Sequence, residues 1–129
     1  MFSTSKADIV CDAGGDATVY VAPGVNINPN GFLVCLRYNP GTIATGADLV
    51  ITGETSGIPI LTKANAGTSV VFYYPRALLN AVAYGAQSTN ASEFIPIKNE
   101  RIKVVVSGGG NGGAGSIEAT LLNLSLIHI

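Results

Sequence analysis

The stretch between residues 100 and 121 constrains the fold more than any other part of this 129-residue chain. Apolar residues recur there at every second position: Ile102, Val104 and Val106 in the first half, then Ile117, Ala119 and Leu121 in the second. Period-two alternation is typical of a strand with one face on a core and the other in water. The pattern therefore predicts two strands.

Glycine dominates residues 107–115, between these two predicted strands. Glycine disfavours helix and adopts positive φ without steric cost, so we expect a β-hairpin closed by a flexible loop. Arg101 and Lys103 would then lie across the hairpin from Glu118 as a weak charge pairing. The loop lacks the Lys-Ser/Thr and the following helix of a phosphate-binding loop, which favours an ordinary hairpin tip.

Other runs rich in β-branched and aromatic residues alternate with Gly, Pro and Asn turns. They predict strands at residues 8–11, 17–22, 32–38, 47–52, 58–62 and 69–74, and residues 93–97 then lead into the predicted hairpin. Pro59 cannot donate to a ladder and therefore indicates an edge strand or a bulge. Residues 32–38 carry few polar groups and are expected in mid-sheet, covered on both sides. Strand alternation would place Phe32, Val34, Leu36 and Tyr38 on one face and Leu33, Cys35 and Arg37 on the other.

Residues 76–84 form the one helix-compatible run, because Leu78, Leu79 and Val82 follow helical spacing. So short a run is marginal as a helix, and we expect at most one short helix at one end of the fold. Together the patterns predict an all-β protein with a single domain over residues 1–123. The expected architecture is an antiparallel β-sandwich or jelly roll of about seven to eight strands.

The last six residues, 124–129, read LSLIHI. The transposon end used to fragment DNA for sequencing libraries encodes this hexapeptide, and we interpret it as adapter read-through rather than native sequence. The alternative is a genuine apolar tail that extends the final strand. On the first interpretation His128, the single histidine, does not belong to the natural protein.

The composition favours a protein that functions in contact with a partner. Charged residues make up 12% of the chain, against about 25% in an average protein. Hydrophobic residues make up 47%, and mean hydropathy is +0.40. A weakly charged surface is poorly protected against association, although a monomer with an uncharged polar coat is the alternative. The net charge is −1 and the basic residues are scattered, which speaks against nucleic acid as a partner.

The N-terminal residues lack the apolar core of a secretory signal, and no apolar run approaches the roughly 18 residues that span a bilayer. We therefore expect a protein that assembles in the cytoplasm, without membrane contact. Cys11 and Cys35 are then expected to be reduced and buried, with a single disulfide as the alternative.

Residues that carry chemistry are sparse. Catalytic Ser-His or Cys-His pairs need a base near neutral pKa, and zinc sites need clustered Cys and His. Four carboxylates could meet in space as a sugar-hydrolysing pair, but each also suits a solvated position beside a strand or turn. These are Asp48, Glu54, Glu93 and Glu100. We expect no enzyme, no cofactor and no metal site.

Contact residues are the remaining candidates. Tyr73 and Tyr74 are adjacent and must point to opposite faces of a strand, so one is expected in the core and one outward. Tyr and Arg are enriched at interfaces, which makes Tyr73, Tyr74 and Arg76 candidate contacts. The glycine loop could order against a neighbouring subunit. Its candidate contacts are Gly109, Gly110 and Asn111.

Several segments resemble small structural proteins encoded in tailed bacteriophages and prophages. The resembling segments are residues 36–41, 49–62, 74–78, 100–106 and 115–117. The resemblance implies a non-enzymatic virion component with a β-sandwich fold, most simply a capsid decoration (cement) or minor head or tail protein. It implies two partners: the major capsid protein and further copies of the chain. A virion location, with assembly in the bacterial host cytoplasm, follows from the same resemblance.

The alternative is a carbohydrate- or receptor-binding module of a phage tail or fibre. Such a module requires an exposed aromatic cluster, and the sequence, which has no Trp, offers little sign of one. Neighbouring genes also separate the two hypotheses, because a capsid or portal gene beside this one favours decoration and a tail-fibre gene favours recognition.

Overall fold

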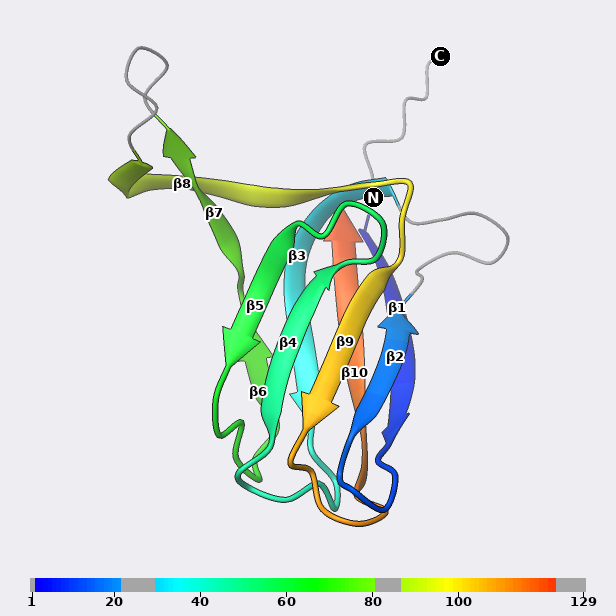
Figure 1. Ribbon diagram of the computed structural model, residues 1–129. Helices are drawn as coiled ribbons and strands as arrows, with labels where there is room; N and C mark the ends of the chain where they lie inside the picture. The colour runs from blue at the N-terminus through cyan, green and yellow to red at the C-terminus, as the bar shows by residue number, and fades with distance from the viewer. Residues whose placement is uncertain (1, 22–29, 81–86, 123–129) are drawn as a thin grey trace.

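The computed structural model describes residues 2–21, 30–80 and 87–122 (Figure 1). Over these residues the protein is all-β and contains no helix. Its ten strands are β1 (Phe2–Val10), β2 (Ala17–Val21), β3 (Asn30–Asn39), β4 (Asp48–Gly53), β5 (Pro59–Lys63), β6 (Val71–Tyr73), β7 (Arg76–Asn80), β8 (Gln87–Lys98), β9 (Ile102–Ser107) and β10 (Ala114–Leu122).

Two antiparallel sheets pack face to face, which confirms the predicted β-sandwich. The large sheet has the order β1-β10-β3-β8-β7, and β6 also pairs with β3. The small sheet has the order β2-β9-β4-β5. In Figure 1 the small sheet lies in front of β1, β10 and β3. Each sheet therefore has an inner face on the core and an outer face.

Inward side chains of both sheets build one core. They alternate along their strands as the sequence predicts, because side chains point to opposite faces at successive positions. Fully buried side chains with no exposed surface include Ile9, Val21, Leu36, Tyr38, Leu49, Ile102, Val104, Val106, Ile117, Ala119 and Leu121. The inward residues predicted for β9 and β10 are thus confirmed.

The predictions for Pro59 are also confirmed. Pro59 begins β5, which is the edge strand of the small sheet. The register between β4 and β5 shifts between Ile51 and Thr52, where Pro59 enters the ladder. An edge position and a bulge are the two places where a residue without an N–H is tolerated.

Strand β3 lies in mid-sheet as predicted, but its side chains face differently. The register with β10 shifts between Thr120 and Leu121, which leaves Val34 as an extra residue on β3. Such a bulge moves the following side chains to the other face. Leu33 is therefore buried with Leu36, whereas Phe32 points outward and is half-buried. Placing Phe32 on one face with Leu36, and covering the strand on both sides, was wrong.

The predicted hairpin over residues 100–121 is wrong as well. Both strands exist, but β9 pairs with β2 and β4, whereas β10 pairs with β1 and β3. The glycine segment therefore crosses from one sheet to the other. Glu118 lies opposite Lys6 and Arg37, not opposite the basic residues of β9. Alternation identifies a strand but not its partner, which depends on distant residues.

The glycine connection is a turn packed against two other loops. Gly108, Gly110 and Gly112 have φ of 70°, 84° and 71°, which favours glycine at each of these positions. Between them Gly109 is buried, donates from its N–H to Gly15 O (2.8 Å), and accepts from the N–H of Ala44 (2.9 Å). The connection is thus bonded to two other loops at the same end of the sandwich.

The helix predicted near 76–84 is contradicted over its described part. Residues 76–80 form β7, with Arg76 opposite Phe94 and Ala77 opposite Glu93 on β8. The remaining positions, 81–84, lie outside the described residues. The spacing of Leu78 and Leu79 from Val82 fits a helix, but the ladder between β7 and β8 determines the conformation of residues 76–80. Strand β6 falls within the strand predicted at residues 69–74, whereas β7 and β8 were not predicted as strands, so the count rises from the predicted seven or eight to the ten described strands.

Strand β7 and the first part of β8 leave the body of the sandwich as a two-stranded ribbon (Figure 1). The second part of β8 returns to the body and pairs with β3 from Asn30 to Leu33. Residues 77–92 contain no Asp, Glu, Lys or Arg. The suspected read-through at 124–129 lies outside the described residues, so its origin stays a prediction.

Candidate protein-contact surface

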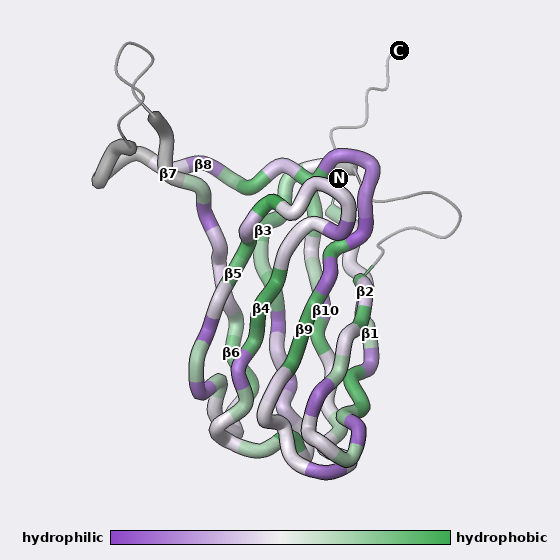
Figure 2. The backbone as a smooth tube through the Cα atoms, in the orientation of Figure 1, coloured by the Kyte–Doolittle hydropathy of each residue, from purple (hydrophilic) through white to green (hydrophobic). Residues whose placement is uncertain are grey.

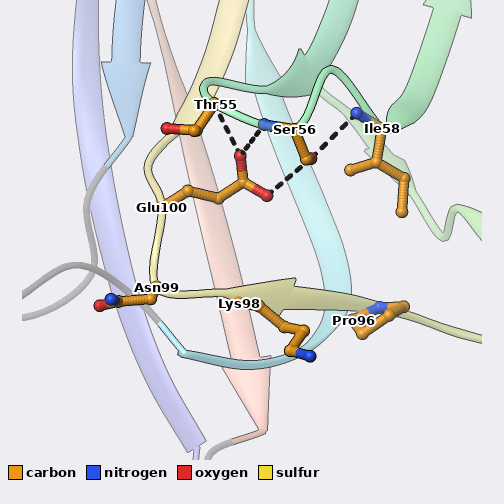
Figure 3. Close-up of a pocket in the computed structure, with 7 residues that line it drawn as sticks. All are labelled: Thr55, Ser56, Ile58, Pro96, Lys98, Asn99 and Glu100. Carbon is orange, nitrogen blue, oxygen red and sulfur yellow. Dashed lines mark hydrogen bonds between the residues drawn. The ribbon is translucent and has the colours of Figure 1, made fainter.

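Glu100 is 5% exposed and lies between β8 and β9. Its side chain points to the turn between β4 and β5 (Figure 3). Oε1 accepts hydrogen bonds from the N–H groups of Thr55 (2.7 Å) and Ser56 (2.8 Å), and Oε2 accepts one from the Ser56 hydroxyl (2.7 Å). Gly53 leaves room for this contact, because a Cβ there would lie 2.8 Å from Oε1.

These bonds determine how Glu100 titrates. Burial raises the pKa of Glu100, but the hydrogen bonds from Ser56 and Thr55 outweigh burial and bring the pKa below its ordinary value. The beginning of the β8–β9 connection is strongly hydrophilic (Figure 2). A cleft of about 350 Å³ opens beside it, lined by Ile58, Pro96 and Lys98 among others. The carboxylate facing this cleft is already engaged in closing a turn.

Glu54 is the second carboxylate at this end of the sandwich. It forms a two-pronged ion pair with Arg101, whose Nε donates to Oε1 at 2.7 Å and whose Nη2 donates to Oε2. The guanidinium also lies over the Tyr20 ring, 4.2 Å from its centroid. The hydrogen bond from Arg101 lowers the pKa of Glu54. The cluster joins the β4–β5 turn to β9 and β2 on the outer face of the small sheet.

The four carboxylates considered for sugar hydrolysis do not gather in one cleft. Asp48 begins β4, at the opposite end of that strand from Glu54, and accepts from the N–H of Asn65 (3.0 Å). Glu93 lies on the exposed part of β8 and accepts from the N–H of Phe94 (3.2 Å). Within residues 2–21, 30–80 and 87–122 no three Asp, Glu, Cys or His side chains are placed to hold a metal ion.

Both cysteines are free thiols. Cys11 is buried, as predicted, and Cys35 is half-buried on β3. Burial raises the pKa of Cys11, and the neighbouring carboxylates of Asp12 and Asp16 raise it further. Its Sγ lies against Gly109, where an added Cβ would approach to 2.7 Å.

The predicted contact residues lie in three settings. Tyr73 turns toward the core beside Tyr38, and Tyr74 is 61% exposed, which confirms their opposite orientations. Gly110 and Asn111 are exposed at the loop end of the sandwich, whereas Gly109 is buried and offers no outer surface.

Arg76 anchors the ribbon to the body. Its Nη1 donates to Val34 O (3.0 Å) and to Pro75 O (2.7 Å), and its guanidinium lies 4.3 Å from the centroid of the Phe94 ring. Val34 is the bulged residue of β3, at the point where β3 changes partner from β8 to β6. The arginine thus occupies the gap in the ladder from which the ribbon departs.

All four phenylalanines of the chain point away from the core on the outer face of the large sheet. Phe2 and Phe72 are 64% and 52% exposed. Phe32 and Phe94 are half-buried, with ring centroids 6.5 Å apart. Their sequence neighbours Leu33 and Ile95 are buried, as is Tyr73 in large part, which fixes the outward orientation.

Tyr74 lies two positions after Phe72 and faces the same way, so five aromatic rings share this surface. We call it the aromatic face: Phe2, Phe32, Phe72, Tyr74 and Phe94. Phenylalanine is among the residues most often buried in a folded chain. Exposed apolar side chains gathered on one face of a protein mark a place where another molecule binds.

Register places the outward residues of the large sheet in rows. One row is apolar and runs Phe2, Leu122, Phe32 and Pro96. A second row runs Lys6, Glu118, Arg37 and Phe72, so its charges alternate in sign. Within the described part of the chain Glu118 makes no ion pair with either basic neighbour, and the ion pair of Lys6 is with Asp8 at 3.9 Å.

The outer face of the small sheet is different. Its outward positions are mainly threonine, valine and lysine: Thr18, Val50, Thr52, Thr62, Lys103 and Val105. Among its described residues Tyr20 is the one outward aromatic, and Arg101 covers that ring. The aromatic character of the sandwich surface is therefore confined to one side.

Sequence reasoning identified Tyr74 and Arg76 but missed the four phenylalanines. Phe72 alternates with Tyr73, so its outward direction was readable once Tyr73 was assigned inward. Phe32 was hidden by the bulge at Val34, and Phe94 by the unpredicted pairing with β7.

No protein-family model matches the sequence, and no curated protein matches it. The described residues include no helix of the length and apolar character needed to cross a bilayer.

Proposed function

We propose that this chain is a non-enzymatic structural protein of a tailed-bacteriophage virion, and that it acts through protein–protein contacts as a capsid decoration or minor head protein. The observation that carries the proposal is the aromatic face, which places every phenylalanine of the chain outside the core. The resemblance of residues 36–41, 49–62 and 74–78 to phage structural proteins supports the virion setting.

The charge distribution supports the same proposal. Only 12% of residues are charged, and residues 77–92 of the ribbon region include none. Exposed strands that must stay free usually carry charge or proline as protection against pairing. Beyond Arg76 and Glu93 at its base, the ribbon omits this protection, which suits contact with another chain.

The two carboxylates with shifted pKa values support a structural role for the protein. Glu54 and Glu100 are the two carboxylates with lowered pKa, and their oxygens are engaged by Arg101, Thr55 and Ser56. Lowered pKa values of this origin stabilise turns, whereas a general acid requires a raised one.

Virions of the phage that carries the gene provide the test. We expect the protein in purified particles at tens of copies or more, located on the capsid surface by cryo-electron microscopy. Its absence from virions, with detection only in the infected-cell lysate, would refute the proposal.

The tail-fibre alternative keeps one specific observation in its favour, because an exposed aromatic cluster is what a recognition module requires. Four of the five rings are phenylalanines, which lack the polar groups that orient a ligand. Titration with capsular and lipopolysaccharide glycans, with Tyr74→Ala as control, separates the two. Saturable glycan binding lost in Tyr74→Ala would favour recognition over decoration.

A further inference from the structure

We infer that a second copy of this chain docks on the aromatic face, so that two large sheets pack against each other around a two-fold axis parallel to the strands, midway between β10 and β3. This inference rests on the proposed function, since it names one of the partners through which a virion protein would act. It follows from the rows of outward residues.

The charged row is its own complement under this symmetry. A two-fold axis between β10 and β3 exchanges the positions of Glu118 and Arg37, so each Glu118 faces Arg37 of the partner copy. The same operation places each Lys6 over Phe72 of the partner copy, where a cation lies on an aromatic ring. All three charges of the row then meet a favourable neighbour across the interface.

The neighbouring rows match as well. In the apolar row Leu122 faces Phe32 of the partner copy, and Phe2 faces Pro96. In the row between them Thr120 faces Cys35 of the partner copy. A two-fold interface uses the same patch twice and must be self-complementary. The outer face of the large sheet meets that condition row by row.

The available area is sufficient for a specific but modest dimer. Four strands about 4.8 Å apart and nine residues long, at about 3.4 Å each, cover roughly 600 Å² per copy. Two copies then bury roughly 1,200 Å², the lower limit for specific interfaces. We therefore expect a reversible dimer. If the aromatic face instead bound an unrelated capsid surface, its rows would not need to be complementary to themselves.

The test uses sedimentation velocity on the full chain and on two charge variants, Glu118→Lys and Arg37→Glu. Each variant alone places like charges across the two-fold axis. We therefore expect the dissociation constant of its dimer to be at least about tenfold higher than that of the wild-type dimer. An equimolar mixture of the two variants restores both opposite-charge contacts and should dimerise. Thr62→Lys, on the outer face of the small sheet, is the matched control and should sediment like the wild type.

Circular dichroism establishes that both charge variants retain the β-sandwich, and restored dimerisation of their mixture excludes a folding defect as the cause. The inference is overturned by a wild-type chain that stays monomeric at about 100 μM, by a dimer insensitive to both variants, or by a mixture that fails to reassociate. A monomeric chain that still occurs in virions refutes this inference alone. A dimer absent from virions refutes the proposed function alone.

Discussion

Replacing Glu100 tests whether this buried carboxylate stabilises the fold. Glu100→Ala removes the acceptor for three hydrogen bonds, from Thr55 N–H, Ser56 N–H and the Ser56 hydroxyl. Hydrogen bonds to a charged group contribute about 1.5–3 kcal/mol each. Thr55 and Ser56 are themselves exposed, so the released donors regain water and the net loss falls to about 1 kcal/mol per bond.

We therefore expect Glu100→Ala to lower the free energy of unfolding by roughly 3 kcal/mol, or the melting temperature by about 10 °C for a domain of this size. Glu100→Gln keeps an oxygen at the Oε1 position and loses mainly the charge, so its cost should be about 1 kcal/mol. A measurable loss in Glu100→Gln, which keeps the size of the side chain, reports the charged hydrogen bonds rather than packing.

Equilibrium urea unfolding at pH 7, followed by far-ultraviolet circular dichroism, measures all three proteins. The slope against urea should not change, since the same surface is exposed on unfolding. A loss below about 0.5 kcal/mol in Glu100→Ala would refute the reasoning, as would equal losses in the Ala and Gln variants.

Three further predictions concern pH, packing and the ribbon. The pKa values of Glu54 and Glu100 in the folded protein lie below their ordinary value of 4.5. Their contribution to the free energy of unfolding is therefore present above pH 4.5 and is lost as pH falls through the folded pKa. Urea unfolding from pH 7 to 3 should show this loss of stability, and the loss should be smaller in Glu100→Gln. Gly109→Ala places a Cβ 2.7 Å from a buried sulfur and should cost about 1–3 kcal/mol in thermal unfolding, whereas Gly46→Ala, with 3.7 Å to its nearest neighbour, should be neutral. Arg76→Ala should speed amide hydrogen exchange in β7 and in the part of β8 paired with it, and should leave exchange in β9 unchanged. Equal exchange rates in β7 of the wild type and of Arg76→Ala would contradict the anchoring role.

Local patterns predicted the strands better than their partners. Strands β4, β9 and β10 were correct because their alternation is uninterrupted and one face of each is buried. The pairing of β9 and β10 was wrong because a glycine connection permits either a hairpin or a crossing between sheets. Contacts of the connection with Gly15 and Ala44, far away in sequence, accompany the second outcome.

The contact surface could be predicted only in part from the sequence, again because it depends on how the strands pair. The opposite orientations of Tyr73 and Tyr74 were predicted correctly, since adjacent residues on a strand point to opposite faces, but the sequence did not say which of the two points outward. The aromatic face as a whole depends on three non-local facts: the bulge in β3, the pairing of β7 with β8, and the position of β1 at the sheet edge. A single sequence shows none of these, because each is a relation between segments.

Radical footprinting of Phe2, Phe72 and Tyr74 in assembled virions and in the dilute chain tests the central claim most directly. These rings are 64%, 52% and 61% exposed in the isolated chain, so they should label readily there and be protected in the particle. Tyr20 and Val50, on the opposite sheet, serve as internal references. Protection of the three rings relative to the two references is the predicted result, and equal labelling of all five residues in both states would contradict it.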